Sequence, residues 1–270
     1  MDFLEYWNMA ERPFENTGDP KFFYYSPNHK EALVRLTYVI KKNKAGALLA
    51  GDYGTGKTSI ANELLEEIKE SEDYHSVCIR NPILSSKELL SEIAYQLGVT
   101  ENFKSRLELR RAIEGALHKI VMEERHTVII IDEAHLMTRR EALEELRLLM
   151  NLQYDNQFMA TIIMMGQLEL RNVINSMPQF KQRFAIFYAL KHLPAEETSK
   201  YIQHRLQISG TGASIFSDTA CGIIHKSSVG RPRQINNICD MSLLVGSMRK
   251  VSQIDEDIVT EVIKDLGEEI

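Results

Sequence analysis

Residues 51–58 hold the most informative pattern in the chain, and they read Gly51-Asp52-Tyr53-Gly54-Thr55-Gly56-Lys57-Thr58. This is the Walker A form Gly-x-x-x-x-Gly-Lys-Thr, in which backbone amides wrap phosphate oxygens. Lys57 would reach the β- and γ-phosphates, and the Thr58 hydroxyl would ligate Mg²⁺. Residues 46–50 before the loop are apolar, and residues 59–70 have a helical pattern. Because strand, loop and helix follow in this order, we expect the stretch from Gly51 to Ser59 to bind ATP.

A pair of acidic residues follows the most apolar strand pattern. Residues 127–131 are five β-branched residues in a row, which is typical of a strand buried on both faces, and Asp132-Glu133 comes directly after them. Ligands of α/β proteins bind at the carboxyl ends of such strands. Asp132 is predicted to hold Mg²⁺ through its water shell, and Glu133 to orient and polarise the attacking water. Glu133 taken alone could also be a helix-start acid, and His135 is given a local packing role.

Guanine specificity is not supported by the sequence. GTPases select guanine with an Asn-Lys-x-Asp sequence at a strand end. The Asn43-Lys44 pair precedes the phosphate loop and lacks the aspartate.

Composition and charge limit the class of protein. The chain has 270 residues, 44% of them hydrophobic and 26% charged, as in a folded globular protein. Cys78, Cys221 and Cys239 are too few and too far apart for a disulfide framework, so we expect free thiols in the cytoplasm. No apolar run approaches the roughly 18 to 20 residues of a membrane-spanning helix, so membrane insertion is not expected. A net charge of -6 does not indicate DNA binding, although a local basic patch would still permit it.

Strand and helix patterns alternate through the first 190 residues and then stop. Strands are expected at residues 46–50, 76–79, 127–131, 160–165 and 184–190, and helices at 85–97, 107–124 and 140–152. After Pro194 the patterns are helical, at residues 196–208, 217–227, 233–248 and 255–266. This predicts an α/β P-loop NTPase fold, a parallel sheet with helices on both faces, followed by a small all-helical lid domain. The predicted boundaries are 1–45 for an amino-terminal strap and helix, 46–193 for the core and 194–270 for the lid.

These motifs together resemble those of the AAA+ ATPases, and the flanks resemble the ExeA type, also called general secretion pathway protein A. The resemblance continues through nearly the whole chain. Transposition ATPases of the TniB and TnsC kind are more distantly similar. The amino-terminal part of the resemblance rests on Trp7-Asn8, Pro13-Phe14, Asp19-Pro20, Phe22-Phe23-Tyr24, Ser26, His29, Glu31-Ala32-Leu33 and Leu36.

The resemblance implies further site residues. Gln167, at the end of the fourth strand, would sense the γ-phosphate, and the alternative is that it is a turn residue at a strand end. Arg183 would be an arginine finger presented to a neighbouring subunit. Arg233, with Arg231 as the alternative, would touch the γ-phosphate from the lid. A cation that opens a helix is disfavoured by the helix dipole, which favours an anionic partner there.

The strap residues Phe23, Tyr24 and Tyr25 either border the adenine or belong to the core, and the sequence does not decide between the two. The expected function is an ATP- and Mg²⁺-dependent switch or motor that works as a homo-oligomeric ring or filament. Its client would be a secretion or pilus-like envelope machine. The alternatives are a DNA-associated transposition regulator and a nucleotide-dependent scaffold with little turnover.

Overall fold

The computed structural model describes residues 3–101, 103–212 and 214–267, and its described part divides into two compact units. The sheet unit consists of residues 30–52 and 60–190. The helical unit consists of the strap up to residue 29, residues 53–59 of the phosphate loop, and the chain from residue 191 onward. The domain boundaries inferred from the sequence remain a prediction.

The sheet unit is built on five parallel strands in the order β2-β3-β6-β1-β7. β1 (Gly46–Gly51), β3 (His126–Ile131) and β6 (Ala160–Gly166) are buried along their whole length, whereas β2 (Tyr74–Ile79) and β7 (Phe184–Leu190) form the edges. Ile131 pairs with Met164, and Ala50 pairs with Gly166. The carboxyl ends of the three central strands therefore meet at one edge of the sheet, and the parallel-sheet prediction is confirmed.

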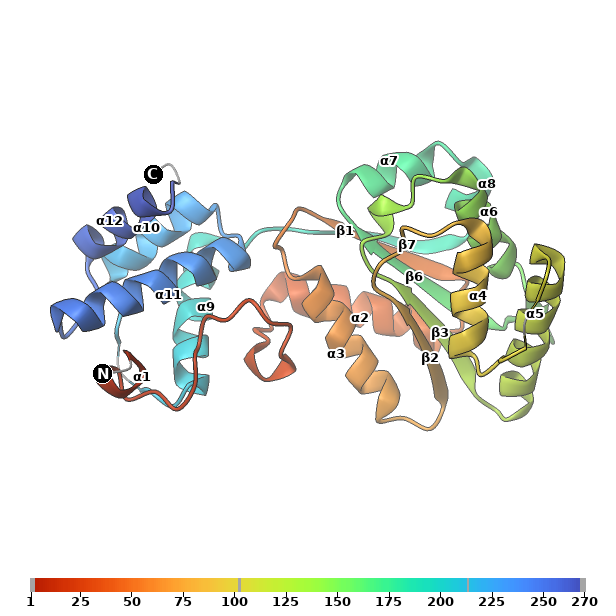
Figure 1. Cartoon of the computed structure of the whole chain (residues 1–270), viewed down its shortest axis with the longest axis horizontal. Helices are drawn as coiled ribbons and strands as arrows, with labels where there is room; N and C mark the ends of the chain where they lie inside the picture. Colours follow the sequence, from red (N-terminus) through yellow and green to blue (C-terminus); the bar gives the residue numbers. More distant parts are fainter. Residues whose placement is uncertain (1–2, 102, 213, 268–270) are drawn as a thin grey trace. The chain divides into compact units, whose positions relative to one another are not determined.

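Helices cover both faces of this sheet (Figure 1). α2 (Pro27–Lys41) and α3 (Lys57–Lys69) lie on one side of the strands, and α4 (Ser86–Gln96) and α5 (Arg106–Met122) lie on the other. Leu48, Ile129 and Ile162 point to the second face and belong to a core cluster with residues of α4 and α5. Alternate strand residues face the opposite side, so burial of both faces accounts for the continuous apolar runs.

The stretch between β3 and β7 differs in detail from the sequence expectation. α6 (Arg140–Leu149) ends three residues before the predicted end at 152, because the chain turns into a short hairpin of β4 (Gln153–Tyr154) and β5 (Gln157–Phe158). Asp155 and Asn156 form its turn with φ of 47° and 61°, a left-handed geometry that suits a two-residue hairpin. Two short helices, α7 (Glu169–Asn175) and α8 (Pro178–Lys181), were not expected.

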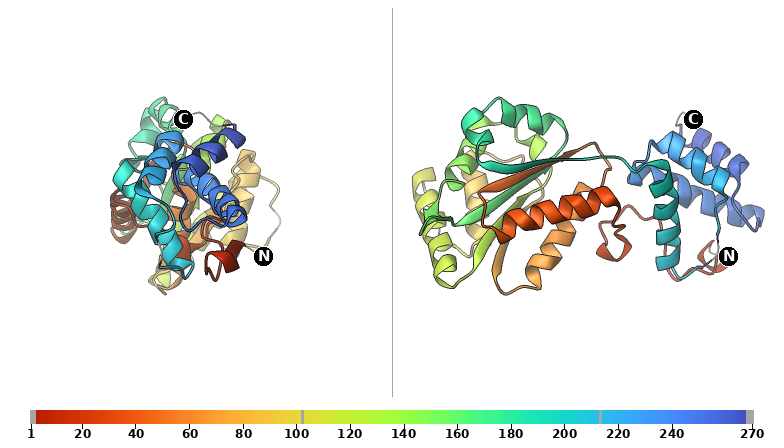
Figure 2. Two further views of the ribbon diagram at one scale, coloured as in Figure 1. Left: turned by 90° about the vertical axis from the view of Figure 1, so that its left-hand side faces the viewer. Right: turned by 180° about the vertical axis from the view of Figure 1, so that it is seen from behind.

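The helical unit packs four helices against the amino-terminal strap. These are α9 (Ala195–Ile208), α10 (Asp218–Ser228), α11 (Pro232–Arg249) and α12 (Glu256–Asp265). α1 (Phe3–Tyr6) lies beside α11, and a 3-10 turn, η1 (Pro20–Phe22), contacts α9 (Figure 2). Trp7 is 6% exposed and its indole Nε1 donates to the Leu243 carbonyl at 2.9 Å. The predicted helical part after Pro194 is thus confirmed. In the described part of the chain, no helix has both the length and the apolar character needed to cross a membrane.

Candidate nucleotide site

The phosphate loop leaves β1 at Gly51 and enters α3 at Lys57. Gly54 and Gly56 have φ of 75° and 95°, values that residues with a Cβ rarely adopt. Thr55 is 1% exposed and Lys57 6% exposed, so the loop is packed and not a free surface turn. The first amides of α3 have no acceptor within the helix, and the helix dipole adds positive potential there. This local geometry is suited to phosphate.

His29 fastens the strap to the phosphate loop within the helical unit. Its Nε2 lies 3.0 Å from the Thr55 carbonyl oxygen, and its Nδ1 lies 2.6 Å from Ser26 Oγ. Because a carbonyl only accepts, Nε2 carries the proton and Nδ1 accepts from the serine hydroxyl. Burial lowers the pKa of His29, which keeps the ring neutral. A Cβ on Gly56 would lie 2.7 Å from Nε2, so glycine is required at this position.

Arg233 reaches the same loop from α11. Its Nη1 donates to the Tyr53 hydroxyl, and its guanidinium carbon lies 5.0 Å from the centre of the Tyr53 ring. A Cβ on Gly54 would lie 3.2 Å from the Arg233 Cβ, so the two backbones approach closely. Arg231 is the N-cap residue of α11 and makes no side-chain capping bond. Of the two arginines considered from the sequence, Arg233 is the one with contacts to Tyr53.

The acid pair stands at the carboxyl end of β3 in the sheet unit. Asp132 is 3% exposed; its amide donates to the Ile79 carbonyl at 2.9 Å and its Oδ1 accepts from the Glu133 amide at 2.8 Å. Glu133 has φ 51° and ψ 32°, the left-handed region that a non-glycine residue enters at a cost. The backbone thus turns sharply at the predicted catalytic carboxylate.

His135 lies next to that carboxylate, with Nδ1 3.3 Å from Glu133 Oε2. From the sequence, His135 was expected to have mostly a local packing role, and its spacing two residues after Glu133 was the signal that could have indicated this contact. A Cβ on Gly166 would lie 3.0 Å from the His135 amide nitrogen. The glycine at the end of β6 therefore lets the turn after β3 come close, and Gln167 follows this contact directly.

Arg183 lies at the amino-terminal end of β7, opposite to the carboxyl ends of the strands where the acid pair lies. It immediately precedes β7, and Phe184 pairs with Gly46 at the start of β1. β7 is parallel to β1, so its seven residues separate Arg183 from the edge where β3 and β6 end by roughly 20 Å. The structure does not bring Arg183 together with the acid pair of its own sheet.

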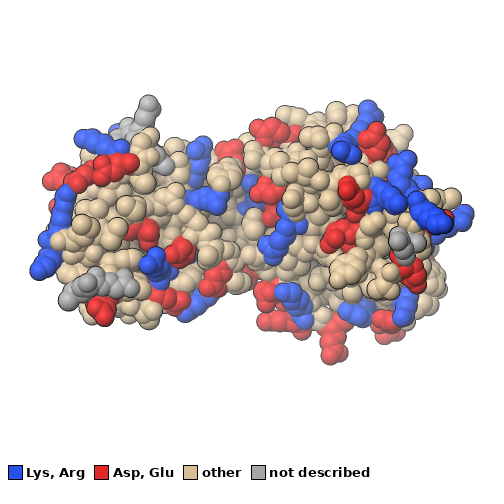
Figure 3. Space-filling view, viewed as in Figure 1, with Lys and Arg blue, Asp and Glu red and all other residues tan. Residues whose placement is uncertain are grey.

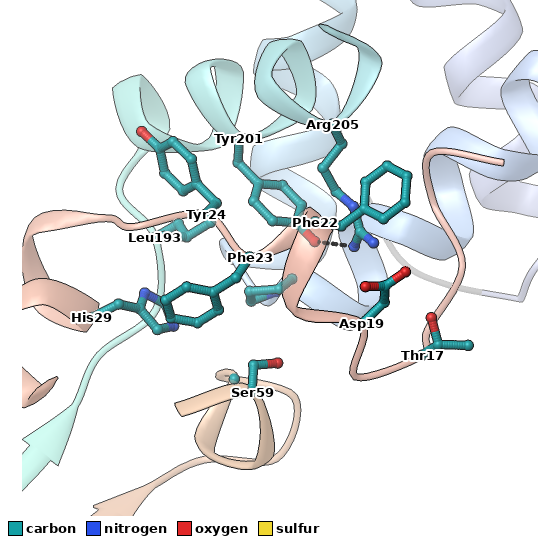
Figure 4. Close-up of a pocket in the computed structure, with 12 residues that line it drawn as sticks. Thr17, Asp19, Phe22, Phe23, Tyr24, His29, Ser59, Leu193, Tyr201 and Arg205 are labelled. Carbon is teal, nitrogen blue, oxygen red and sulfur yellow. Dashed lines mark hydrogen bonds between the residues drawn. The ribbon is translucent and has the colours of Figure 1, made fainter. Parts of the chain in front are cut away.

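A pocket in the helical unit adjoins the phosphate loop (Figure 4). It has a volume of about 50 Å³, and it is lined by Thr17, Asp19, Phe22, Phe23, Tyr24, His29, Gly56, Ser59, Leu193, Tyr201, Arg205 and Pro232. Phe23 and Tyr24, which the sequence analysis left open, are thus in the lining. Tyr25 is 43% exposed and packs edge-on against Phe23.

The polar groups of this pocket are fixed by hydrogen bonds. Arg205 is 5% exposed, donates to the Tyr201 hydroxyl at 2.7 Å and lies over the Phe22 ring. The Tyr24 hydroxyl donates to Glu197 at 2.9 Å, and burial with this carboxylate raises its pKa to about 12. Sequence reasoning missed Tyr201 and Arg205, because residues on α9 meet the strap only after folding.

The residues predicted to hold Mg²⁺ have suitable chemistry. Thr58 supplies a hydroxyl oxygen from the second position of α3, and Asp132 a buried carboxylate. Mg²⁺ prefers oxygen ligands and is usually held by one or two protein groups together with phosphate oxygens and water. The residues that the structure describes contain no cluster of three or more His, Cys, Asp or Glu side chains that could hold a metal ion.

Comparison with known proteins gives the class. The family model described as "AAA domain" matches residues 40–174, which include the phosphate loop and the acid pair, and the chain belongs to this family. Among curated proteins, the chain is similar to General secretion pathway protein A of Aeromonas hydrophila. The two are 31% identical over 251 residues, which cover 92% of this chain and 45% of that protein. The chain thus spans less than half the length of this relative. The resemblance to the ExeA type is confirmed.

Solved structures agree on the fold. The ORC2 protein of Aeropyrum pernix, solved as ADPNP-ADP complexes, superposes with a TM-score of 0.70 at 15% identity, covering 95% of this chain and 72% of that chain. Drosophila ORC bound to DNA superposes with a TM-score of 0.72 at 14% identity, covering 97% and 66%. At such identities the likeness shows the fold, and the roles of individual residues come from the geometry described above. The likeness to transposition ATPases remains a prediction.

Proposed function

We propose that the chain binds and hydrolyses ATP with Mg²⁺ as a subunit of an oligomeric switch or motor. Lys57 and the loop amides bind the phosphates, and Thr58 and Asp132 hold the metal ion. The bound Mg²⁺ supplies positive charge to the β- and γ-phosphate oxygens. Glu133 polarises the attacking water, Gln167 contacts the γ-phosphate, and Arg183 completes the site of a neighbouring subunit.

One observation supports this proposal most. A phosphate loop with two left-handed glycines follows a buried central strand, and a buried aspartate followed by a glutamate ends the strand two places away in the same sheet. Glu133 is held in a strained backbone conformation next to His135. Strain of this kind is found at functional sites more often than in ordinary turns.

The pocket beside Gly56 and Ser59 is our candidate for the adenine site. Phe22, Phe23 and Tyr24 supply aromatic surface, and Asp19 and Arg205 supply polar groups to read ring edges. A cavity of about 50 Å³ is smaller than the roughly 150 Å³ cavity known to take up benzene. A purine therefore enters only when a lining side chain moves.

A nucleotide titration tests the proposal. Fluorescent ATP with Mg²⁺ is titrated into the wild-type chain, with unlabelled ATP, ADP and GTP as competitors, and phosphate release is followed in parallel. We expect saturable binding displaced by ATP and ADP, poor displacement by GTP, and measurable turnover. If the folded wild-type chain does not bind fluorescent ATP, the proposal is wrong. Binding without turnover at every protein concentration would favour the scaffold alternative.

For the client, we propose a secretion or pilus-like envelope machine served from the cytoplasm. The similarity to General secretion pathway protein A supports this, and the free Cys78, Cys221 and Cys239 suit a reducing compartment. The alternative is a DNA-associated regulator. The net charge is -6, and charges of both signs are interspersed on the face in Figure 3, which gives that alternative no broad basic surface in this view.

Duplex DNA separates the two clients. If duplex DNA raises turnover and its binding depends steeply on salt concentration, the result supports a DNA-associated function and argues against the envelope function. If DNA leaves turnover unchanged while secretion components co-purify with the tagged chain, the envelope role is supported. A Lys57→Ala chain serves as the control in both arms, because it should not respond to ATP.

A further inference from the structure

Tyr53 is an aromatic residue at a position of the phosphate loop where the motif accepts any residue. Its side chain is 59% exposed, so burial does not explain where it lies. Its contacts are specific instead. The ring and the hydroxyl both engage Arg233, a residue 180 positions further along the chain and in the same helical unit.

The contact uses both parts of the tyrosine. The guanidinium carbon lies 5.0 Å from the ring centre, within the distance at which a cation is attracted by the face of an aromatic ring. Nη1 of Arg233 also donates to the phenol oxygen. The phenol proton stays available to donate elsewhere, and the guanidinium has further N–H groups beyond the one used here.

Arg233 needs such a partner. It is the second residue of α11, where the positive end of the helix dipole disfavours a cation, and the first turn of α11 contains no acidic residue. The electron-rich face of Tyr53 offsets this repulsion and keeps the arginine against the loop.

We propose that Tyr53 is a positioning residue for Arg233, and that the pair makes the site prefer a nucleoside triphosphate over a diphosphate. The inference rests on the proposed function, because it needs a nucleotide at the phosphate loop. Tyr53 fixes one edge of the guanidinium at the loop, and the remaining N–H groups are directed to the terminal phosphate, which ADP lacks.

The test measures the ratio of ADP to ATP dissociation constants by fluorescent-nucleotide titration in Mg²⁺. Four variants are compared with the wild type: Tyr53→Leu, Tyr53→Phe, Arg233→Ala, and the double variant Tyr53→Leu/Arg233→Ala. Tyr53→Leu should lower the preference for ATP about two- to fivefold, with ADP affinity unchanged. Tyr53→Phe keeps the ring face and should lose less. In the Arg233→Ala background, Tyr53→Leu should have no further effect.

The control is Tyr95→Leu, which removes a tyrosine that is 69% exposed on α4 of the sheet unit. Circular dichroism confirms that each variant is folded. An equal loss of ATP and ADP affinity in Tyr53→Leu would assign the tyrosine to loop structure alone and overturn the inference. A gain in ATP preference would show that Tyr53 competes with the phosphate, which overturns it as well. If the wild type binds neither nucleotide, the proposed function fails with it, an outcome distinct from normal binding that is insensitive to Tyr53.

Discussion

The two units of the molecule hold different kinds of candidate site residue. The helical unit holds the groups that we propose recognise a nucleotide, namely most of the phosphate loop, Arg233 and the aromatic pocket. The sheet unit holds the acids that would activate water and bind metal, at the carboxyl edge of its strands. We therefore predict that nucleotide recognition and catalysis can be changed separately by mutation. Changes in the helical unit should alter affinity, and changes at the sheet edge should alter turnover.

Lys57→Ala tests the recognition side and should have the largest effect. A phosphate loop without its lysine loses the main side-chain cation for the triphosphate, so ATP binding should be abolished or severely weakened and turnover should fall to background. Titration with fluorescent ATP measures this. Lys69→Ala, at the exposed end of the same helix, is the matched control and should bind normally. Wild-type affinity in a folded Lys57→Ala chain would contradict the assignment of the loop.

Arg183→Ala tests whether Arg183 contributes to ATP hydrolysis at the site of a neighbouring subunit. Arg183 lies at the amino-terminal end of its strand, whereas Glu133 lies at the carboxyl ends of the strands. We therefore expect Arg183 to contact the nucleotide of a neighbouring subunit. An arginine finger is typically worth about 10³ to 10⁵ in rate, so this variant should bind ATP almost normally and hydrolyse it poorly. Steady-state phosphate release measures the loss, with Lys181→Ala as the control.

Mixing Arg183→Ala with Lys57→Ala sharpens this test. An intact Lys57 and a neighbour's intact Arg183 can meet only between different subunits, so the mixture should regain turnover that neither variant has alone. If both variants assemble with wild-type protein and their mixture stays inactive at every ratio, Arg183 is a surface charge and the finger assignment is wrong.

Glu133→Gln tests the chemistry at the sheet edge. An amide cannot polarise water as a carboxylate does, so turnover should fall by about 10²- to 10⁴-fold while ATP and Mg²⁺ still bind. The variant should also trap assemblies in the ATP-bound form. Phosphate release and nucleotide titration are measured side by side, with Glu141→Gln on α6 as the control. Unchanged phosphate release would remove Glu133 from the catalytic residues.

His126 offers a smaller, structural test confined to the sheet unit. It is 7% exposed, and its Nε2 lies 2.8 Å from Thr161 Oγ1, which itself donates to the Lys44 carbonyl. Burial lowers the pKa of His126 from 6.5 to about 4, so the unfolded chain binds the proton more readily. The free energy of unfolding is therefore highest above pH 6.5, where His126 is neutral in both states, and it decreases as the pH falls toward 4. The His126 pKa shift corresponds to a change of about 3 kcal/mol in the free energy of unfolding between these two pH limits.

Denaturant unfolding at pH 7.5 and pH 5 measures this effect in the wild type and in His126→Gln. Glutamine keeps a donor for Thr161 but does not titrate, so its loss of stability between the two pH values should be smaller by about 2 kcal/mol. Equal losses in both chains would show that His126 does not titrate differently on folding.

The sheet unit could be predicted from the sequence more fully than the helical unit. β1, β3 and β6 follow from uninterrupted apolar runs, and Asp132 and Gln167 follow from their places after those runs. The β4–β5 hairpin was missed because its turn uses Asp155-Asn156 and not the stronger Asn-Gly signal. The contacts of His29 with Thr55 and of Arg205 with Phe22 were missed because these partners are distant in sequence. No local pattern encodes the contact of Tyr53 with Arg233.

The left-handed backbone at Glu133 bears on how this sequence would change over generations. Glycine or asparagine would adopt that conformation with less strain. Glutamate at this position therefore lowers the free energy of unfolding by about 1 kcal/mol relative to those residues. If the proposed hydrolysis is no longer under selection in a copy of the gene, glycine or asparagine should therefore become favoured at this position. Such a descendant would fold more stably, still bind nucleotide through the helical unit, and no longer turn it over.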